Sequence, residues 1–261
     1  MYQKVGASPW PFLGATGLWV VAVGFISYVF FHGWSYLFYG LFCVLCVAGF
    51  WWRDVFREVG CLGCGTSSVL GYYKAGFILF LISEAFLFFS FIWSYVHFGC
   101  MSLVQVGCYW PPRGVVPIDA WGWPFFGTCL LLSSGVSSQV AHGYLKIGDK
   151  VGCFFWMVVT VILGVWFVIV QGKEFSTAKF SMADTVFGGC FFIVTGCHGA
   201  HVLVGLVFLL VNLFRMVVGG YWPSNHWGFR AGLWYWHFVD GIWIVVWSVL
   251  YHWGGWDYVG F

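Results

Sequence analysis

Seven runs of mostly apolar residues make up most of this chain, and each is about as long as a helix that crosses a bilayer. A helix needs about 20 mostly apolar residues to span the hydrocarbon core, which is roughly 30 Å thick. Charged residues, glycines and prolines separate the runs. We therefore predict seven transmembrane helices over residues 12–31, 34–52, 73–98, 125–142, 151–171, 186–214 and 231–253.

The composition excludes a soluble protein. Of the 261 residues, 61% are hydrophobic and only 8% are charged, whereas soluble globular domains carry about 25% charged residues. So few charges cannot cover a hydrophobic core, and the apolar surplus must face lipid. A net charge of +2 gives no basic face for nucleic acid. The predicted fold class is all-α and integral to the membrane, with one membrane domain over residues 1–261.

Basic residues are distributed unevenly between the two sides of the predicted bundle. Loops on the cytoplasmic or matrix side of a membrane carry an excess of Lys and Arg. The N-terminal side holds eight of them and the opposite side three: Lys4, Arg53, Arg57, Lys74, Lys146, Lys150, Arg215 and Arg230 against Arg113, Lys173 and Lys179. We therefore expect the N-terminus in the cytoplasm or matrix. Residues 1–10 lack the features of a removable presequence, which favours a bacterial protein or one made inside an organelle.

Most of the cysteines lie inside the apolar runs, where cysteine behaves as a small hydrophobic residue. Cys61 and Cys64 have the spacing of a zinc or redox pair, but no second pair or histidine cluster flanks them. Cys100 and Cys108 share one predicted loop. Whether either pair bonds stays open.

One carboxyl group, Glu84, falls near the middle of the third predicted span. An ionisable side chain at this depth is costly and normally faces protein, water or a partner. The apolar residues around it favour an uncharged carboxyl, hydrogen-bonded to a neighbouring helix. The alternative is a proton-responsive site.

Histidines in the last two spans offer two further interpretations. His198 and His201 share a face of the sixth span, so they are candidates for a metal or haem site, or for hydrogen bonds to adjacent helices or to lipid headgroups. His237 and Asp240 are three residues apart on the seventh span, which favours a pair that fixes helix packing. No set of ligands matches a closed metal site, so we predict no metal in this chain. The sequence also shows no P-loop, Ser-His-Asp arrangement, HExxH or Rossmann glycine pattern, so we predict no catalytic residue.

The stretch after the second span combines indoles with arginines. Trp52 lies next to Arg53, and Arg57 follows one turn later. Arginine presents a planar fork of donors that suits a phosphate group. The stretch is therefore a candidate site for an anionic lipid, and a solvated, positively charged loop is the alternative.

Several motifs along the chain resemble subunit III of the haem–copper cytochrome c oxidases. Their order and spacing fit that family over nearly the whole length. The matching pieces are Ser8-Pro-Trp-Pro11, Trp51-Trp-Arg-Asp-Val55 with Arg57-Glu58, Ile82-Ser-Glu84, Trp110-Pro-Pro112, Ser134-Gly-Val136, Ala141-His142, Gly148-Asp149, Thr195-Gly196, His198-Gly199, His201-Val202, Ser224-Asn-His226 and Trp234-Tyr-Trp-His-Phe-Val-Asp240.

The resemblance implies a V of seven helices, with two in one arm, five in the other and phospholipids in the cleft. It implies a cofactor-free subunit of the terminal respiratory proton-pumping oxidase, which reduces oxygen to water with haems and coppers held by partner subunits. The partners would be subunit I as the main contact, subunit II and accessory subunits. The subunit would stabilise the catalytic core, hold phospholipid and support proton uptake. The implied location is the mitochondrial inner membrane with the N-terminus in the matrix, or alternatively a bacterial plasma membrane.

The family's functional residues carry over by motif. Glu84 is the buried carboxyl, and the candidate lipid-headgroup residues are Trp52, Arg53, Arg57, Glu58, His201, Arg215 and His226. The chain departs from the family at Arg230, where a Glu is usual, and at Gly63-Cys64-Gly65 and His226-Trp227, where histidine pairs are usual. Two other readings compete with this one: a membrane cytochrome with His198, His201 or His237 on haem iron, and a transporter with Glu84 in its pathway.

Overall fold

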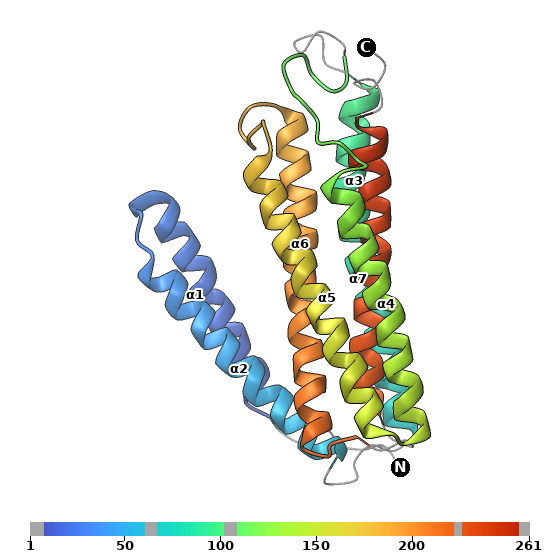
Figure 1. Ribbon diagram of the computed structural model, residues 1–261. Coiled ribbons are helices and arrows are strands. Elements are labelled where there is room, and N and C mark those ends of the chain that lie inside the picture. Colours follow the sequence, from blue (N-terminus) through green and yellow to red (C-terminus); the bar gives the residue numbers. More distant parts are fainter. Residues whose placement is uncertain (1–7, 61–66, 102–108, 222–225, 256–261) are drawn as a thin grey trace. The chain divides into compact units, whose positions relative to one another are not determined.

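The computed structural model describes residues 8–60, 67–101, 109–221 and 226–255, and its regular structure over these ranges is entirely helical (Figure 1). The all-helical fold predicted from the apolar runs is thereby confirmed. The elements in chain order are α1 (Trp10–Phe31), α2 (Ser35–Gly60), α3 (Ser67–Cys100), α4 (Trp123–Ile147), α5 (Lys150–Thr177), α6 (Val186–Val217), α7 (Trp227–Val246) and a π-helical extension of α7, η2 (Trp247–Trp253).

Six of these helices are long and apolar enough to cross a membrane, and α4 is the exception among the described helices. The polar side chains of α4 explain its lower hydropathy. Ser134, Ser137 and Ser138 are buried, and each hydroxyl donates to a backbone carbonyl of its own helix. Ser137 also bonds Thr160 of α5 at 2.8 Å. Because α4 packs against both α5 and α7, its small polar residues face protein rather than lipid.

The second helix continues further than the apolar run that predicts it. The sequence predicts a loop over Trp51–Glu58, after a span over residues 34–52, but this stretch forms part of α2, which runs to Gly60. Charged residues stop a segment from entering the hydrocarbon core, yet Arg and Glu are good helix formers. The charged stretch therefore ends the apolar run without ending the helix.

The chain divides into two compact units, Met1–Tyr72 and Tyr73–Phe261. In the first unit, α1 and α2 form a hairpin whose connection includes His32, with a left-handed backbone at φ 54°. Gly24 lets the two helices approach, because a Cβ there would lie 2.5 Å from the backbone nitrogen of Leu37. The expectation of one membrane domain over residues 1–261 stays a prediction.

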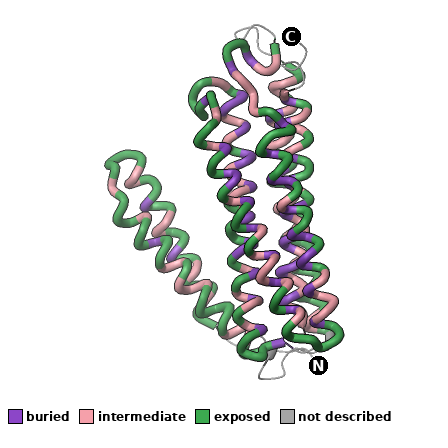
Figure 2. The backbone as a smooth tube through the Cα atoms, in the orientation of Figure 1, coloured by how far each residue is buried: buried purple, intermediate pink, exposed green. Residues whose placement is uncertain are grey.

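The second unit is a bundle of α3 to α7 in which the buried residues concentrate along α4–α7 (Figure 2). Gly148, with φ 88°, ends α4, and the side chain of Asp149 then caps α5 by accepting from the amides of Val151 and Gly152. Thr185 caps α6 through a bond from the amide of Gly188. Short, capped connections of this kind join antiparallel neighbours.

Trp236 of α7 lies at the centre of this bundle and is fully buried. Its indole nitrogen donates to Ser134 Oγ of α4 at 2.9 Å. A Cβ added at Gly164 of α5 would lie 2.8 Å from the indole, and one added at Gly205 of α6 would lie 2.9 Å from it. The two glycines therefore allow α5 and α6 to close around one aromatic side chain.

Three of the four cysteines in the two candidate pairs lie outside the described residues: Cys61, Cys64 and Cys108. Cys100 is described and is exposed at the end of α3. The question of whether Cys61 bonds Cys64, or Cys100 bonds Cys108, therefore stays as open as the sequence leaves it.

Candidate functional site

Glu84 of α3 and His201 of α6 form a polar pair between two helices. The carboxylate oxygen Oε2 lies 2.9 Å from the imidazole Nε2. Glu84 lies midway along α3, and His201 lies midway along α6. Both side chains are thus at the depth where a membrane offers neither water nor headgroups.

Each ring nitrogen of His201 has a partner that orients the imidazole. Its Nδ1 lies 2.8 Å from the carbonyl oxygen of Cys197, one turn earlier in α6, so Nδ1 carries a proton and donates it. The Nε2 atom then shares one proton with Glu84: either a neutral carboxyl donates to neutral histidine, or the imidazolium donates to the carboxylate. Both arrangements leave the pair without net charge, which is the condition for keeping it in the membrane interior.

The burial of Glu84 stays a prediction, because this chain alone buries the Glu84 side chain only in part. Its side chain is 23% exposed and that of His201 is 16% exposed, so both are partly buried within this chain. The reason is that α3 meets the bundle along one edge only. Its residues on either side of Glu84, such as Ile82 and Phe86, are exposed.

His198 lies one turn before His201 in α6 and is fully buried. Aromatic rings surround its imidazole: ring centroids lie 5.0 Å away for Trp243, 5.8 Å for Phe167 and 6.4 Å for Phe88. Neither ring nitrogen has a hydrogen-bond partner among the described residues. Among the described residues, His198 therefore packs helices together through ring contacts, and not through the hydrogen bonds that the sequence offers as one interpretation.

The candidate lipid residues of the first unit lie in the last turns of α2. The guanidinium of Arg53 binds Asp54 at 2.9 Å and lies over the ring of Phe50. The same carboxylate accepts from the indole of Trp10 at 2.9 Å, which ties the start of α1 to α2. The other candidates of this group are exposed: Trp52, Arg57 and Glu58.

Arg215, another candidate, is held at the end of α6 by Tyr221. Its Nη1 donates to the phenol oxygen at 3.0 Å, and its guanidinium lies 4.5 Å from the centre of the ring. The phenol in turn donates to Asn212 Oδ1 at 2.5 Å. Burial raises the pKa of Tyr221 to about 12, so the phenol keeps the proton that it donates at all physiological pH values.

We expect Tyr221→Phe to lower the free energy of unfolding by about 1–2 kcal/mol, because it removes two hydrogen bonds but keeps the ring beneath Arg215. Denaturant titration of the purified protein in detergent micelles would measure the change. Tyr72→Phe is the control, since Tyr72 is 74% exposed. Equal stability of the two variants would contradict the role assigned to the phenol.

His226, the last headgroup candidate, contacts a residue for which the sequence indicates no role. Its Nε2 lies 3.3 Å from Nε2 of His142 in α4. The positive charges of Lys146 and Arg230 also act on His142. The ends of α4 and α7 therefore gather basic side chains that are distant in sequence. The pairing could not be found from local spacing, because 84 residues separate the two histidines.

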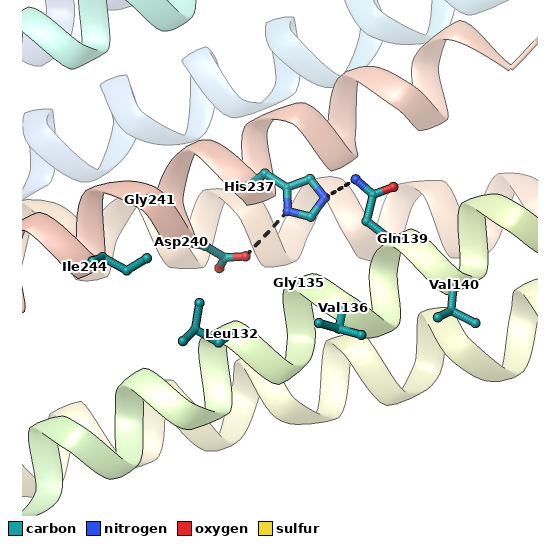
Figure 3. Close-up of a pocket in the computed structure, with 9 residues that line it drawn as sticks. All are labelled: Leu132, Gly135, Val136, Gln139, Val140, His237, Asp240, Gly241 and Ile244. Atoms are coloured by element: carbon teal, nitrogen blue, oxygen red, sulfur yellow. Dashed lines mark hydrogen bonds and ion pairs between the residues drawn. The ribbon is translucent and has the colours of Figure 1, made fainter.

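The pair predicted on α7 has a third member. His237 Nδ1 lies 3.8 Å from Asp240 Oδ2, and His237 Nε2 lies 2.8 Å from Gln139 Nε2 of α4 (Figure 3). Within the described part of the chain, no group of three or more His, Cys, Asp or Glu residues could hold a metal ion. The Nε2 atoms of His201 and His237 already have side-chain partners, so neither ring is presented toward a haem iron.

Comparisons with known proteins agree with the resemblance seen in the motifs. A family model described as "Cytochrome c oxidase subunit III" matches residues 1–255. The chain is 40% identical to "Cytochrome c oxidase subunit 3" of Branchiostoma lanceolatum over 253 residues, which cover 97% of each chain. It is 38% identical to the protein of that name from Papio hamadryas over 253 residues, and 39% identical to that from Arabidopsis thaliana over 256 residues, with 97% of each chain covered in both cases.

Proposed function

This chain belongs to the cytochrome c oxidase subunit III family, and we propose that within the oxidase it stabilises the catalytic core, holds phospholipid and supports proton uptake. Members of the family are multi-span membrane subunits of an oxidoreductase complex. The observation that carries the proposal is the family match, which extends over residues 1–255 rather than over a single motif. The chain's own role is then that of a subunit without a catalytic centre.

Binding of phospholipid headgroups is supported by the basic side chains at helix ends. Arg53 lies in the last turns of α2, and Arg215 lies in the last turn of α6. Each guanidinium is oriented by a neighbour, Asp54 and Tyr221 respectively. An oriented guanidinium binds a phosphate through two parallel hydrogen bonds. We propose Arg53, Arg57, Arg215 and His226 as headgroup contacts, with Trp52 and Glu58 beside them; a headgroup contact of His201 stays a prediction, because its Nε2 is bonded to Glu84.

We expect Arg53→Gln and Arg215→Gln each to lower the amount of anionic phospholipid that stays with the purified oxidase, because each removes a charged fork of donors. Mass spectrometry of lipids extracted from the complex would measure the loss. Lys173→Gln is the matched control, since Lys173 is exposed and lies near the C-terminal end of α5, on the side of the predicted bundle opposite to Arg53 and Arg215. Unchanged lipid in both arginine variants would contradict headgroup binding.

The proposal that the subunit supports proton uptake is favoured by the Glu84–His201 pair, because its two groups share a proton without net charge. The partners proposed are subunit I as the main contact, subunit II and accessory subunits. We propose the mitochondrial inner membrane as the location. The excess of Lys and Arg on the N-terminal side supports an N-terminus in the matrix.

A further inference from the structure

Two basic side chains and two indoles meet at one end of the second unit, between α3 and α7. Lys74 lies near the start of α3, and Arg230 lies in the first turn of α7. The Lys74 Nζ atom is 5.7 Å from the ring centre of Trp227, and the Arg230 Cζ atom is 5.6 Å from that of Trp234. The two indoles contact each other edge to face, with ring centres 5.5 Å apart. The cations and indoles therefore form one surface, joined by cation–π contacts.

The end of α4 adds positive charge beside this surface. Lys146 lies in the last turn of α4, and its charge acts on His142 together with that of Arg230. Lys74 and Lys146 are exposed, and Arg230 is half-buried. Of the guanidinium nitrogens of Arg230, Nε is the one that is covered and unpartnered. A ligand from outside the chain would therefore meet Arg230 at its two terminal nitrogens.

No described acid neutralises these cations. The chain has nine Asp and Glu residues, of which only Asp257 lies outside the described residues. The described acids form ion pairs with Arg53, His201 and His237, and none with Lys74, Lys146 or Arg230. Asp149 follows Lys146 by three residues, but its carboxylate caps α5. Like charges gathered in this way repel one another unless an anion lies among them.

The cations lie at the depth where a membrane presents headgroups. The predicted spans 73–98 and 231–253 begin beside Lys74 and Arg230, and the span 125–142 ends four residues before Lys146. Indoles are also favoured at this depth. Ile78 and Ile82 follow Lys74 along α3 at intervals of about one turn and are 44% and 46% exposed. An exposed apolar strip therefore runs from the cations toward the membrane interior.

We propose that Lys74 and Arg230 bind the phosphate of an anionic phospholipid, with Lys146 beside them and an acyl chain along Ile78 and Ile82. The site rests on the proposed function, because it adds to the headgroup contacts a set on α3 and α7 that includes none of the residues proposed above. A carboxylate of another subunit would match the charge alone. A phospholipid matches the charge, the depth and the apolar strip together.

A photoreactive side chain at Ile78 would identify the occupant in the assembled oxidase, reconstituted in phosphatidylcholine vesicles with about one-tenth phosphatidylglycerol. The control position is Phe155, which is 59% exposed and lies near the start of α5, at the same end of the bundle. We expect the ratio of anionic to zwitterionic lipid among the covalent products to be roughly fivefold higher at Ile78 than at Phe155, the factor that one nearby Lys or Arg contributes. Equal ratios at the two positions, or a product of Ile78 with a polypeptide of another subunit, would overturn the proposal.

Neutral variants of the two cations test which side chains hold the lipid. We expect Lys74→Gln and Arg230→Gln each to lower the anionic ratio at Ile78 by roughly two- to fivefold. Lys74 is exposed, so its variant keeps the test decisive even where Arg230→Gln disturbs folding. Lys179→Gln is the matched control, since Lys179 is exposed and precedes α6 at the opposite end of the bundle. An unchanged ratio at Ile78 in Lys74→Gln would refute the site.

This site and the headgroup contacts proposed above can fail separately. Arg53→Gln removes a cation of the first unit, so it should leave the anionic ratio at Ile78 unchanged. The total lipid retained by Arg53→Gln and Arg215→Gln tests the earlier contacts alone. A ratio at Ile78 that falls as far in Arg53→Gln as in Lys74→Gln would contradict a local site on α3 and α7.

Discussion

Trp236→Ala is expected to lower the free energy of unfolding by about 3 kcal/mol, the low end of the range for replacing a buried aromatic side chain by alanine. Lipid solvates an indole almost as well as the bundle interior does, so the transfer of the side chain contributes little. What remains is the cavity between α5 and α6 and the lost bond to Ser134 Oγ. The cavity cannot close readily, because Gly164 and Gly205 present no side chains that could fill it.

Denaturant titration in mixed micelles, followed by circular dichroism, would measure this change. Trp166→Ala is the matched control, because Trp166 lies in the middle of α5 but is 54% exposed. Trp236→Phe should cost about 1 kcal/mol, since it keeps most of the ring and loses one hydrogen bond. Equal losses in Trp236→Ala and Trp166→Ala would show that the bundle is not organised around the buried indole.

The positions of the helices could be predicted from the apolar runs, but their ends could not. The length of an apolar run indicates which residues meet hydrocarbon. A helix, in contrast, continues as long as its backbone groups can hydrogen-bond to one another. The charged residues Arg53 and Asp54 therefore lie inside α2, and α4 extends to Ile147 beyond the expected residue 142. Gly148 is different, because its left-handed conformation stops a helix directly.

The partners of the polar residues were predictable only where they lie on one helix. The spacing of His237 and Asp240 indicates a shared face, and the two lie 3.8 Å apart. The partner of Glu84 is 117 residues away in sequence. The helical register of α3 alone gives no sign of it, because the partner depends on how α3 and α6 pack.

Gln139 was missed for a different reason. A single amide in a serine-rich helix gives no motif, and its role depends on a histidine of α7 that lies 98 residues further along the chain. Its position inside the predicted span 125–142 was the available signal. An amide at membrane depth needs a partner as much as a carboxyl does.

Glu84→Ala and His201→Ala are each expected to lower the free energy of unfolding by about 1–3 kcal/mol, because each leaves the other polar group without its partner between two helices. The double variant should cost less than the sum of the two, with a coupling energy of about 1–2 kcal/mol. Glu84→Gln should stay within about 1 kcal/mol of the unaltered protein, since its amide still donates to His201 Nε2. Ser83→Ala is the control, because the Ser83 hydroxyl is exposed and bonds the backbone of its own helix at Phe80.

Infrared spectra of the same variants test whether the carboxyl of Glu84 stays uncharged at this depth. In His201→Ala no imidazole remains beside the carboxyl, so Glu84 holds the proton itself and the carbonyl stretch of a protonated carboxyl appears. The double variant Glu84→Gln with His201→Ala lacks that band, which assigns it. Oxygen reduction should persist in every one of these variants, because electron transfer takes place in the catalytic subunits. Additive losses of stability in the double alanine variant would mean that the two side chains are not coupled across α3 and α6. A His201→Ala spectrum without the carboxyl band would contradict the expectation that Glu84 stays uncharged at this depth.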